Sequence, residues 1–463
     1  MKRKQIIGSL LFLLILMFCG HAKAQETDQL FLLPGISQSS ILNPAIQNKS
    51  EKLVIGVPFL SGANFSWNSN FPLDALFSNG LWNYSFHDFY NNLPPNGEVQ
   101  ASVRASMFYA SMNIKNYSFN ISLSDRAFTT ASFDREVVRL IRDGIHPYFE
   151  NDENFGSGTF DFNHFRELAF GVSQRYWKSL DIGIRPKILF GRTYYHAQDI
   201  NFSVETITNE NEQKELHLKP EGSFLMAAPV NYTVDSVFNY VLFSNDAIPA
   251  DYSFNLRNLG MAIDFGVVYR PNEFYEFSAS LLDLGFTGFR HNTYDVEFVD
   301  PIEFPTYELY QSYAPGDSVA IKYIEPREAL RAFSDSVSYI ISVQDLPVRE
   351  VDLLPFKINL TGKYNFSESF SAGVSSQFSY YGRHSMNVLS GFAQKSFQRA
   401  EIGGNVSVYN TSAIWLGLAA GYTAEHVQYY ISTKNIFGII LPANSKHINL
   451  SFGINFLFNT KRQ

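Results

Sequence analysis

Cysteine is nearly absent from this sequence of 463 residues, and the single one is Cys19. It lies in an N-terminal stretch with the pattern of a secretory signal. Lys2–Lys4 is positive, Ile6–Cys19 is apolar, and Ala22-Lys23-Ala24 offers small residues for cleavage. We expect cleavage before Gln25, which leaves a mature chain without cysteine. Disulfides, thiolate metal sites and cysteine nucleophiles are therefore excluded.

Long apolar runs and a surplus of basic residues are also missing. After the signal, no stretch reaches the ~18 consecutive apolar residues of a membrane-spanning helix. The chain has 36 Lys and Arg against 44 Asp and Glu, and without residues 1–24 it has 32 against 44, a net charge of −12. Such an acidic chain repels phosphate, so we expect no nucleic-acid partner. An exported chain of this kind is either soluble outside the inner membrane or crosses a membrane as a closed sheet.

The composition is otherwise that of a folded β protein. Aromatic residues make up 16% of the chain and charged residues only 17%. A disordered chain needs few aromatic residues and high charge density, and a helical coiled coil needs abundant Ala, Glu, Lys and Leu. The composition therefore excludes both classes.

Apolar and polar residues alternate with period two from about residue 52 onward. At the C-terminus, apolar residues occupy even positions from Ile448 to Phe458, and polar residues occupy odd positions from Asn449 to Asn459, except for Leu457. Similar alternation occurs in residues 99–107, 117–124, 260–270, 354–361 and 414–422. Strands of about 9–11 residues span a bilayer at the usual tilt. Short joins between the runs, such as Lys115-Asn116, indicate antiparallel hairpins.

Alternation alone would also fit a soluble β-sandwich with one wet face. Two features favour a membrane barrel. The polar face is rich in Gly, Ser and Asn, as a hydrated lumen is, and Phe and Tyr lie near strand ends, where rings settle at membrane interfaces. A sheet in lipid must close, because its backbone groups have to be paired internally. We predict an all-β fold, a closed antiparallel transmembrane β-barrel of about 14 strands (roughly 12 to 16) with short helical inserts, in the bacterial cell outer membrane.

The pattern predicts three parts. They are a cleaved signal peptide (1–24), an N-terminal lead segment (25–51), and the barrel (52–463) with inserts near 134–167 and 301–350. Helices are expected at Asp134–Gly144, where Asp134 can cap the first turn, and at Pro326–Asp335.

The lead segment does not alternate. It contains the apolar run Leu30–Pro34 and then Asn43-Pro44-Ala45, in which Asn-Pro is a turn initiator. Two interpretations are open: the segment tucks into the barrel as a partial plug, or it forms a flexible periplasmic leader.

Catalytic and cofactor motifs are not recognisable in the sequence. Gly156-Ser157-Gly158 lacks the Lys-Ser/Thr of a phosphate loop, and no His-Glu-x-x-His or Gly-x-Ser-x-Gly occurs. We expect no enzyme activity, no cofactor and no metal. A Ser/His/Asp site formed only in three dimensions would not be visible here, so an outer-membrane enzyme stays the weaker alternative.

Charged residues on the polar faces are the candidate functional residues. We expect nine of them to face the lumen: Arg104, Asp181, Arg185, Lys187, Asp264, Arg270, Asp283, Lys357 and Lys363. They either form ion-pair ladders that tune a channel or simply balance one another and hydrate the wall.

Asp283 needs a change of register to face the lumen. The polar residues of its segment are even-numbered up to Ser280, and the doublet Leu281-Leu282 then precedes Asp283 and Gly285. A β-bulge at Leu281-Leu282 would keep the carboxylate of Asp283 out of lipid, where it would cost up to a few kcal/mol.

Five segments carry a resemblance to a known family. They are Ser39–Ala45, Leu123–Arg126, Lys187–Gly191, Asn258–Gly266 and Ser278–Phe286. Together they resemble a family of Bacteroidota outer-membrane barrels without an assigned function. That family is similar to the fatty-acid-transporter-like barrels, which include a type IX secretion component, and Asn-Pro-Ala looks like a feature of another type IX-associated family.

Two functional hypotheses follow. The resemblance implies a conduit for small or hydrophobic molecules, with an open or gated lumen and outer-membrane lipid as its surroundings. The alternative is a non-transporting scaffold or anchor for surface or secretion machinery of a type IX or gliding-like kind. The scaffold would have a filled lumen and a surface or secretion-machinery protein bound through the inserts.

Overall fold

The computed structural model defines most of the chain. It describes residues 29–47, 52–76, 86–143, 146–148, 150–177, 179–208, 214–228, 232–234, 241–243, 253–298, 302–305, 341–344, 350–381, 384–409 and 413–459. The expected signal peptide (1–24) and the expected helix at Pro326–Asp335 lie outside these residues. Within the described ranges, each helix is too short or too polar to cross a membrane.

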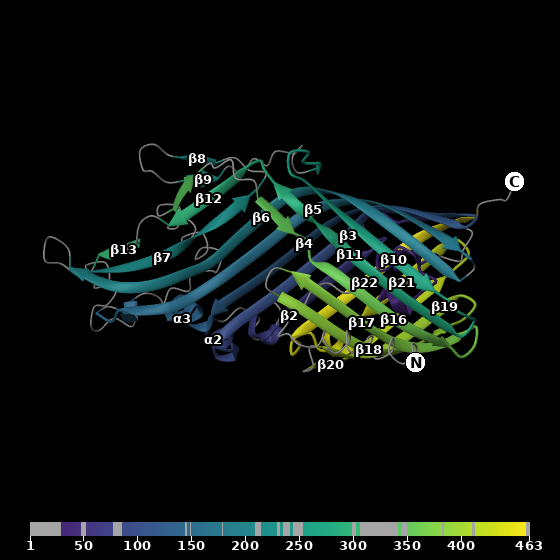
Figure 1. Ribbon diagram of the computed structural model, residues 1–463. Helices are drawn as coiled ribbons and strands as arrows, with labels where there is room; N and C mark the ends of the chain where they lie inside the picture. The colour runs from purple at the N-terminus through teal and green to yellow at the C-terminus, as the bar shows by residue number, and fades with distance from the viewer. Residues whose placement is uncertain are drawn as a thin grey trace, which may run out of the picture.

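Antiparallel strands dominate the structure (Figure 1). The strands of the barrel are β1 (Lys52–Gly56), β2 (Ala63–Ser69), β3 (Asn96–Ile114), β4 (Tyr117–Asp134), β5 (Glu153–Tyr176), β6 (Leu180–Thr208), β10 (Leu259–Tyr269), β11 (Tyr275–Phe289), β15 (Glu350–Leu353), β16 (Phe356–Asn365), β17 (Phe370–Tyr381), β18 (His384–Ser396), β19 (Ala400–Tyr409), β20 (Ala413–Thr423), β21 (Val427–Thr433) and β22 (His447–Asn459).

These sixteen strands close into a ring. The order around it is β3, β4, β5, β6, β10, β11, then β16 to β22, and β22 pairs with both β1 and β2, which also pair with β3. β1 and β2 share one position, and β15 and β16 share another beside β11. The sixteen strands therefore fill 14 positions, and the prediction of a closed antiparallel barrel of about 14 strands is confirmed.

The two ends of the ring differ. At one end the connections are short, as at Lys115-Asn116 between β3 and β4 and at residues 366–369 between β16 and β17. The first residue of β1 also lies there, paired with the last residue of β22 (Lys52 with Asn459). In outer-membrane barrels the short turns face the periplasm and the longer loops face outward. The opposite end is therefore the extracellular one.

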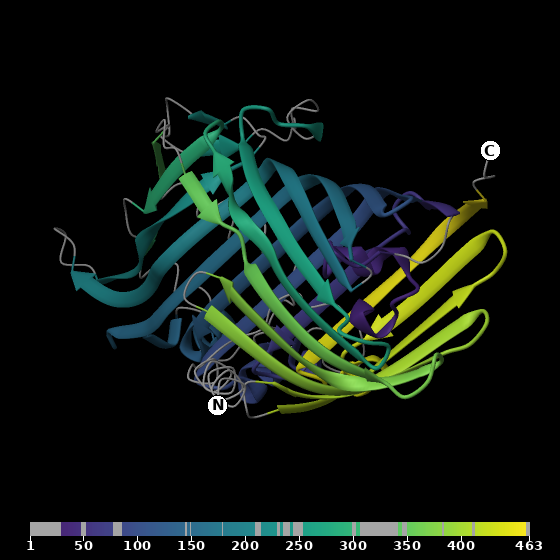
Figure 2. The ribbon, with the colours of Figure 1, turned by 45° about the vertical axis from the view of Figure 1, so that its right-hand side comes forward.

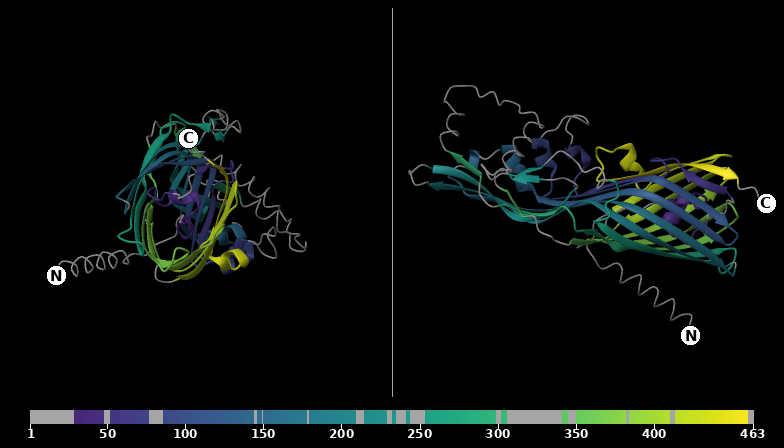
Figure 3. Two further views of the ribbon diagram at one scale, coloured as in Figure 1. Left: turned by 90° about the vertical axis from the view of Figure 1, so that its right-hand side faces the viewer. Right: turned by 90° about the horizontal axis from the view of Figure 1, so that it is seen from above.

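A curved sheet projects from the extracellular end (Figures 1 and 3). In it, β5 and β6 continue past the ring beside β7 (Lys214–Ala227), β12 (Thr293–Phe298), β13 (Ile302–Pro305) and β14 (Ile341–Gln344). β8 (Tyr232–Val234) and β9 (Val241–Phe243) form a separate pair. Within the described residues, the α-helices are α2 (Phe86–Asn92), α3 (Arg135–Asp143) and α7 (Ile436–Ile440), and single 3-10 turns lie at Leu73–Leu76 and His146–Tyr148.

The insert near 134–167 differs from the sequence-based expectation. Its helix is present as α3, and Asp134 accepts a hydrogen bond from the backbone N–H of Glu136 at 3.0 Å. Residues 153–167, however, belong to strand β5. Three register shifts with β6 interrupt this part of β5, so the alternation changes phase repeatedly and is hidden in the sequence.

The outer face of the ring is apolar. Side chains that alternate outward remain exposed, among them Val374 (61%), Val406 (52%) and Ile414 (75%). Aromatic side chains gather at the periplasmic turns: Tyr117, Tyr176, Trp177, Tyr269, Phe274, Tyr275 and Phe366 are all at least 40% exposed. An apolar band with an aromatic girdle at its edge is the surface that lipid requires. The protein is therefore an outer-membrane β-barrel.

Arginine at Val406 is expected to destabilise the barrel more than arginine at Ile402. Both side chains point outward from β19, but Val406 lies deeper in the band, and Ile402 lies two residues from the start of the strand. An arginine at the bilayer midplane costs about 2–4 kcal/mol and one near the interface about 0–1. Urea unfolding of Val406→Arg and Ile402→Arg in lipid vesicles measures this difference. Equal losses of unfolding free energy in the two variants would contradict this placement of the apolar band.

Candidate functional site

The N-terminal segment, residues 29–47, lies inside the ring toward its periplasmic end (Figure 2). It forms two 3-10 turns, η1 (Leu30–Leu32) and η2 (Ser37–Ile41). Leu30, Leu32, Leu33 and Ile36 in its first part are at most 1% exposed, and Phe31 is partly buried. They pack against Phe392, Ala419 and Tyr430, which point inward from β18, β20 and β21. The apolar start of the segment therefore has an apolar patch of the inner wall as its partner.

Polar contacts fix the middle of the segment to the wall. The side-chain amide of Gln38 donates to the backbone carbonyl of Ser61 and to Oδ1 of Asn455, both at 2.6 Å. The hydroxyl of Tyr109 donates to the carbonyl of Ser37 at 2.8 Å.

The guanidinium of Arg185 donates to the carbonyls of Ser40 at 3.1 Å and Ile41 at 2.8 Å. The backbone groups of this irregular segment are thus satisfied by lumen-facing side chains.

The Asn43-Pro44-Ala45 turn sits on two glycines. Oδ1 of Asn43 accepts the backbone N–H of Ala45 at 2.9 Å, which makes a local side-chain turn. Gly183 on β6 and Gly266 on β10 are direct cross-strand partners beneath it. A Cβ atom at position 266 would lie 2.0 Å from Oδ1 of Asn43, and one at position 183 would lie 2.2 Å from the carbonyl carbon of Pro44. The turn can approach the wall this closely only because both residues lack a side chain.

A central ionic cluster lies on the inner wall opposite β18 to β20. Lys187 on β6 contacts both Asp264 (2.9 Å) and Asp283 (2.5 Å). Arg126 on β4 contacts Asp283 at 2.9 Å and Glu167 at 2.7 Å. All five side chains are at most 4% exposed.

Three further cations complete the central ionic cluster. Arg185 contacts Asp264 at 2.5 Å, Arg104 lies 3.8 Å from Glu167, and Lys357 lies 3.7 Å from Asp283. Arg185 is also the residue that holds the carbonyls of η2. The cluster is therefore continuous with the contacts of the N-terminal segment.

A second cluster lies nearer the periplasmic turns. Asp181 accepts from Arg175 at 2.8 Å and from Arg270 at 2.6 Å, and Glu276 accepts from Arg270 at 2.7 Å and from Lys363 at 2.8 Å. The nine residues expected to face the lumen all fall in these two clusters. The structure brings Arg104, Arg185, Lys187, Asp264, Asp283 and Lys357 together in the central one, and Asp181, Arg270 and Lys363 in the other.

Sequence reasoning did not single out four partners in these clusters, namely Arg126, Glu167, Arg175 and Glu276. Arg126 and Glu167 each sit in a pair of adjacent charged residues, Asp125-Arg126 and Arg166-Glu167. One member of such a pair faces inward and the other outward, and composition does not say which. The alternation of residues 117–124 extends to Arg126 and would have placed it on the polar face, whereas the face of Glu167 follows from the cross-strand register, in which Asp125 pairs with Arg166.

Asp283 occupies a β-bulge. Leu282 and Asp283 together oppose the single residue Asp264 of β10, and Asp283 has a φ of 58°. The bulge was expected at Leu281-Leu282 and lies one residue later. The difference follows from the backbone N–H of Asp283, which donates to Oδ1 of Asp264 at 2.7 Å and so turns this residue into the bulge. Asp tolerates the left-handed conformation better than Leu does.

One group of apolar side chains lies on the inner wall of β18 to β20 toward the extracellular end. Met386 and Val388 on β18 cluster with Tyr409 and Trp415, all at most 7% exposed, and Phe392 continues the inward row of β18. The rings of Tyr409 and Trp415 stack with centroids 4.4 Å apart, and the imidazole of His447 lies 4.7 Å from Trp415.

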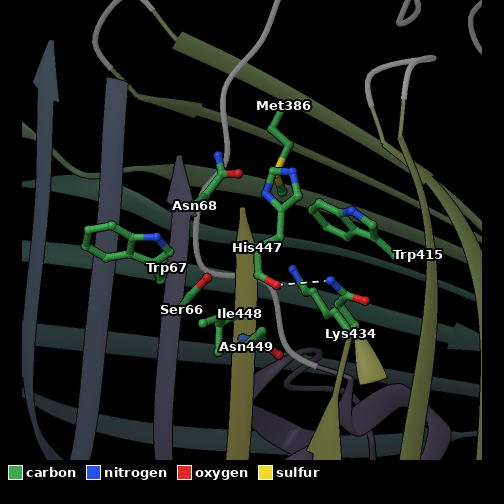
Figure 4. A pocket seen from close by; sticks show the side chains of 10 residues that line it. Ser66, Trp67, Asn68, Met386, Trp415, Lys434, His447, Ile448 and Asn449 are labelled. Carbon is green, nitrogen blue, oxygen red and sulfur yellow. Dashed lines mark hydrogen bonds between the residues drawn. The ribbon is translucent and has the colours of Figure 1, made fainter. Parts of the chain in front are cut away.

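A small pocket opens at this group. Figure 4 shows Met386, His447 and Trp415 gathered at it. Its lining also includes Asn68, Lys434 and Asn449. Across the part of the chain that the structure describes, no three His, Asp or Glu side chains are grouped to hold a metal ion.

Comparisons with solved structures return proteins of a similar fold. They include the Ralstonia pickettii toluene transporter TbuX (7% identity, 92% of this chain and 95% of that chain, TM-score 0.45) and a Pseudomonas aeruginosa FadL homologue (9%, 92% and 95%, TM-score 0.42). A mutant of the monoaromatic hydrocarbon channel TodX matches with 8% identity over 95% and 97% of the two chains, with a TM-score of 0.44.

Curated protein sequences contain no match to this chain. A family model does match it, over residues 44–434, which include every strand of the ring except β22. The chain belongs to the Family of unknown function (DUF5723).

Proposed function

We propose that this barrel is a conduit for small hydrophobic molecules and that residues 29–47 act as its partial plug. The observation that carries the proposal is the apolar lane of the lumen. We define the apolar lane as Met386, Val388 and Phe392 on β18, Tyr409 on β19, and Trp415 and Ala419 on β20.

The lane offers an apolar solute two groups of apolar side chains along the lumen wall, one toward the extracellular end and one toward the periplasmic end, with Ser390 between them on β18. A general porin has a polar, water-filled interior, in which an apolar solute gains nothing by entering. Each apolar square ångström that moves from water to an apolar contact gains about 25 cal/mol. A strip of aromatic and aliphatic side chains therefore favours apolar over polar solutes, while the central ionic cluster lies across the ring on β3 to β6, β10, β11 and β16.

The N-terminal segment blocks the periplasmic end of the lane. Leu30, Leu33 and Ile36 share one cluster with Phe392 and Ala419, and the ring of Phe31 meets that of Phe392 edge-on at 5.3 Å. A solute that follows the lane inward reaches these side chains, so passage requires the segment to shift.

Asparagine at Val388 is expected to lower the passage of an apolar dye by roughly 5-fold, because a polar group in the lane costs ~1 kcal/mol of contact with the solute. Val388 is 3% exposed and faces the lumen. The assay measures entry of N-phenylnaphthylamine and of a small sugar into liposomes that contain the purified protein. Ser375→Asn is the matched control, since Ser375 faces the lumen from β17 outside the lane. Equal dye entry for both variants, or sugar entry as fast as dye entry, would overturn the proposal.

A partner protein in surface or secretion machinery stays a prediction. Gentle detergent extraction of the tagged protein from its native membrane, followed by mass spectrometry, tests it. A stoichiometric partner that survives washing would favour the scaffold hypothesis, and a solitary barrel would favour the conduit.

A further inference from the structure

The apolar outer face of β4 to β6 ends in charged residues. Along paired strands, outward-facing Phe119 and Val172 (40% and 37% exposed) begin the row near the periplasmic turn. Two further outward pairs follow toward the extracellular side, and the next outward pair is Asp125 with Arg166. Arg166 lies ten residues from the end of β5, which is about the length of strand that spans a bilayer. This is the level at which the lipid headgroups of the outer leaflet begin.

Two arginines converge on Asp125 at this level. Arg166 donates to both carboxylate oxygens, Nε at 2.8 Å and Nη2 at 3.0 Å, and Nη1 of Arg192 lies 3.2 Å from Oδ2. The guanidinium of Arg166 also covers the ring of Phe254 at 5.1 Å, and Phe254 packs on Phe190. The segment before β10 thus folds over the outside of the wall and holds these charges in place.

Two further arginines, Arg257 and Arg290, lie near the buried Arg166 and Arg192, and their side chains are exposed. Arg257 precedes β10 and Arg290 follows β11, and β10 and β11 are neighbours in the ring. Asn258 ties the two connections together, because its Oδ1 accepts the backbone N–H of Arg290 at 2.8 Å. Nη1 of Arg257 lies 2.8 Å from Nε2 of His291. The outer arginine patch is defined as Arg166, Arg192, Arg257 and Arg290, and its first two members contact the carboxylate of Asp125. It gathers four guanidinium groups in a chain whose net charge is −8.

Apolar side chains lie directly below the outer arginine patch on β10, which Arg257 precedes, and on β11, which Arg290 follows. Leu259 and Met261 on β10 are 40% and 64% exposed, and Leu284 on β11 is 48% exposed. A ligand that used both surfaces would have an anionic head at the arginines and an apolar tail along the barrel wall.

We propose that the outer arginine patch binds the phosphate of an outer-leaflet phosphoglycolipid. A guanidinium matches phosphate geometry in a bidentate way and is more weakly hydrated than an ammonium, so it suits a partly buried interfacial site. Basic clusters at the membrane surface bind lipid head groups by this chemistry. The continuity of the patch with the apolar band selects a lipid over a free anion, because a free anion gains nothing from Leu259, Met261 and Leu284.

The experiment compares the wild type with Arg257→Gln/Arg290→Gln. Both substituted side chains are exposed and lie outside the strands, so the ring is left intact. The control is Lys214→Gln/Lys219→Gln, which removes the same charge from the projecting sheet. The probe is diphosphorylated lipid A in mixed detergent micelles, with binding read by native mass spectrometry. We expect at least tenfold weaker lipid A binding for the arginine variant and no change for the lysine variant.

Two results would overturn the proposal. One is lipid A binding by the arginine variant that equals binding by the wild type, provided that the variant keeps the heat-modifiable electrophoretic mobility of a folded barrel. The other is displacement of lipid A by an equal concentration of inorganic phosphate, which would show an ion site and not a lipid site. If the arginine variant did not fold, lipid A binding to Leu259→Asn/Met261→Asn would decide, since a lipid site must also weaken when its apolar part is removed.

Discussion

Valine in place of Gly266 is expected to release the N-terminal segment and to raise the entry of a small sugar into liposomes by at least tenfold. A Cβ atom there would lie 2.0 Å from Oδ1 of Asn43 and 2.8 Å from the backbone nitrogen of Ala45. The side chain of Asn43 holds the turn and donates to the carbonyl of Val267 at 3.3 Å. Without this contact, the Asn43-Pro44-Ala45 turn no longer packs against β10. The segment then leaves the lumen, and the lumen fills with water.

The matched control is Gly391→Val. Gly391 lies in β18, and a Cβ atom there would meet nothing within 4 Å, so the same substitution leaves the segment in place. Deletion of residues 29–47 gives the reference value for an open lumen. Sugar entry for Gly266→Val that equals the Gly391→Val value, in a folded barrel, would show that the Asn43 turn does not hold the segment.

Leucine in place of Asp283 is expected to cost about 3–5 kcal/mol of unfolding free energy. Breaking a buried ion pair by removing one partner costs that much, because the other charges stay buried without compensation. Here Arg126 and Lys187, at 2.9 and 2.5 Å, and Lys357, at 3.7 Å, would face an apolar side chain. The φ of 58° at this position adds a backbone penalty that Leu bears and Asp or Asn bears less.

Urea unfolding in lipid vesicles measures this loss, and two further variants separate its causes. Asp283→Asn keeps the backbone preference and hydrogen-bonding capacity but removes the charge, so it is expected to lose less than the leucine variant. Asp283→Leu/Arg126→Met also removes the cation that donates to both carboxylate oxygens of Asp283 and is expected to recover part of the loss. A loss below about 1 kcal/mol for Asp283→Leu would mean that water in the lumen screens the cluster.

The sequence by itself determined the ring and its two faces. Period-two alternation is a local property, since successive side chains of a strand point to opposite faces. Ile414 and Phe456 could therefore be placed toward lipid, and Asn449 and Asn455 toward the lumen, without knowing any strand partner. Leu457, the one apolar residue at a polar position of the C-terminal run, is also visible in the sequence. In the structure it is buried against Val54 and Tyr109.

Only the tertiary structure decided which of these residues meet. Asp283 and Arg126 lie 157 residues apart in sequence and Gln38 and Asn455 lie 417 apart, and ring closure and register bring them together. The outward position of Arg166 depends on its pairing with Asp125, and the bulge at Asp283 depends on a backbone hydrogen bond to Asp264. The fit of Asn43-Pro44-Ala45 on Gly183 and Gly266 requires the N-terminal segment, β6 and β10 all to be in place. Alternation fixes a face within one strand, whereas the partners across a lumen follow from strand count, register shifts and the path of the chain through the ring.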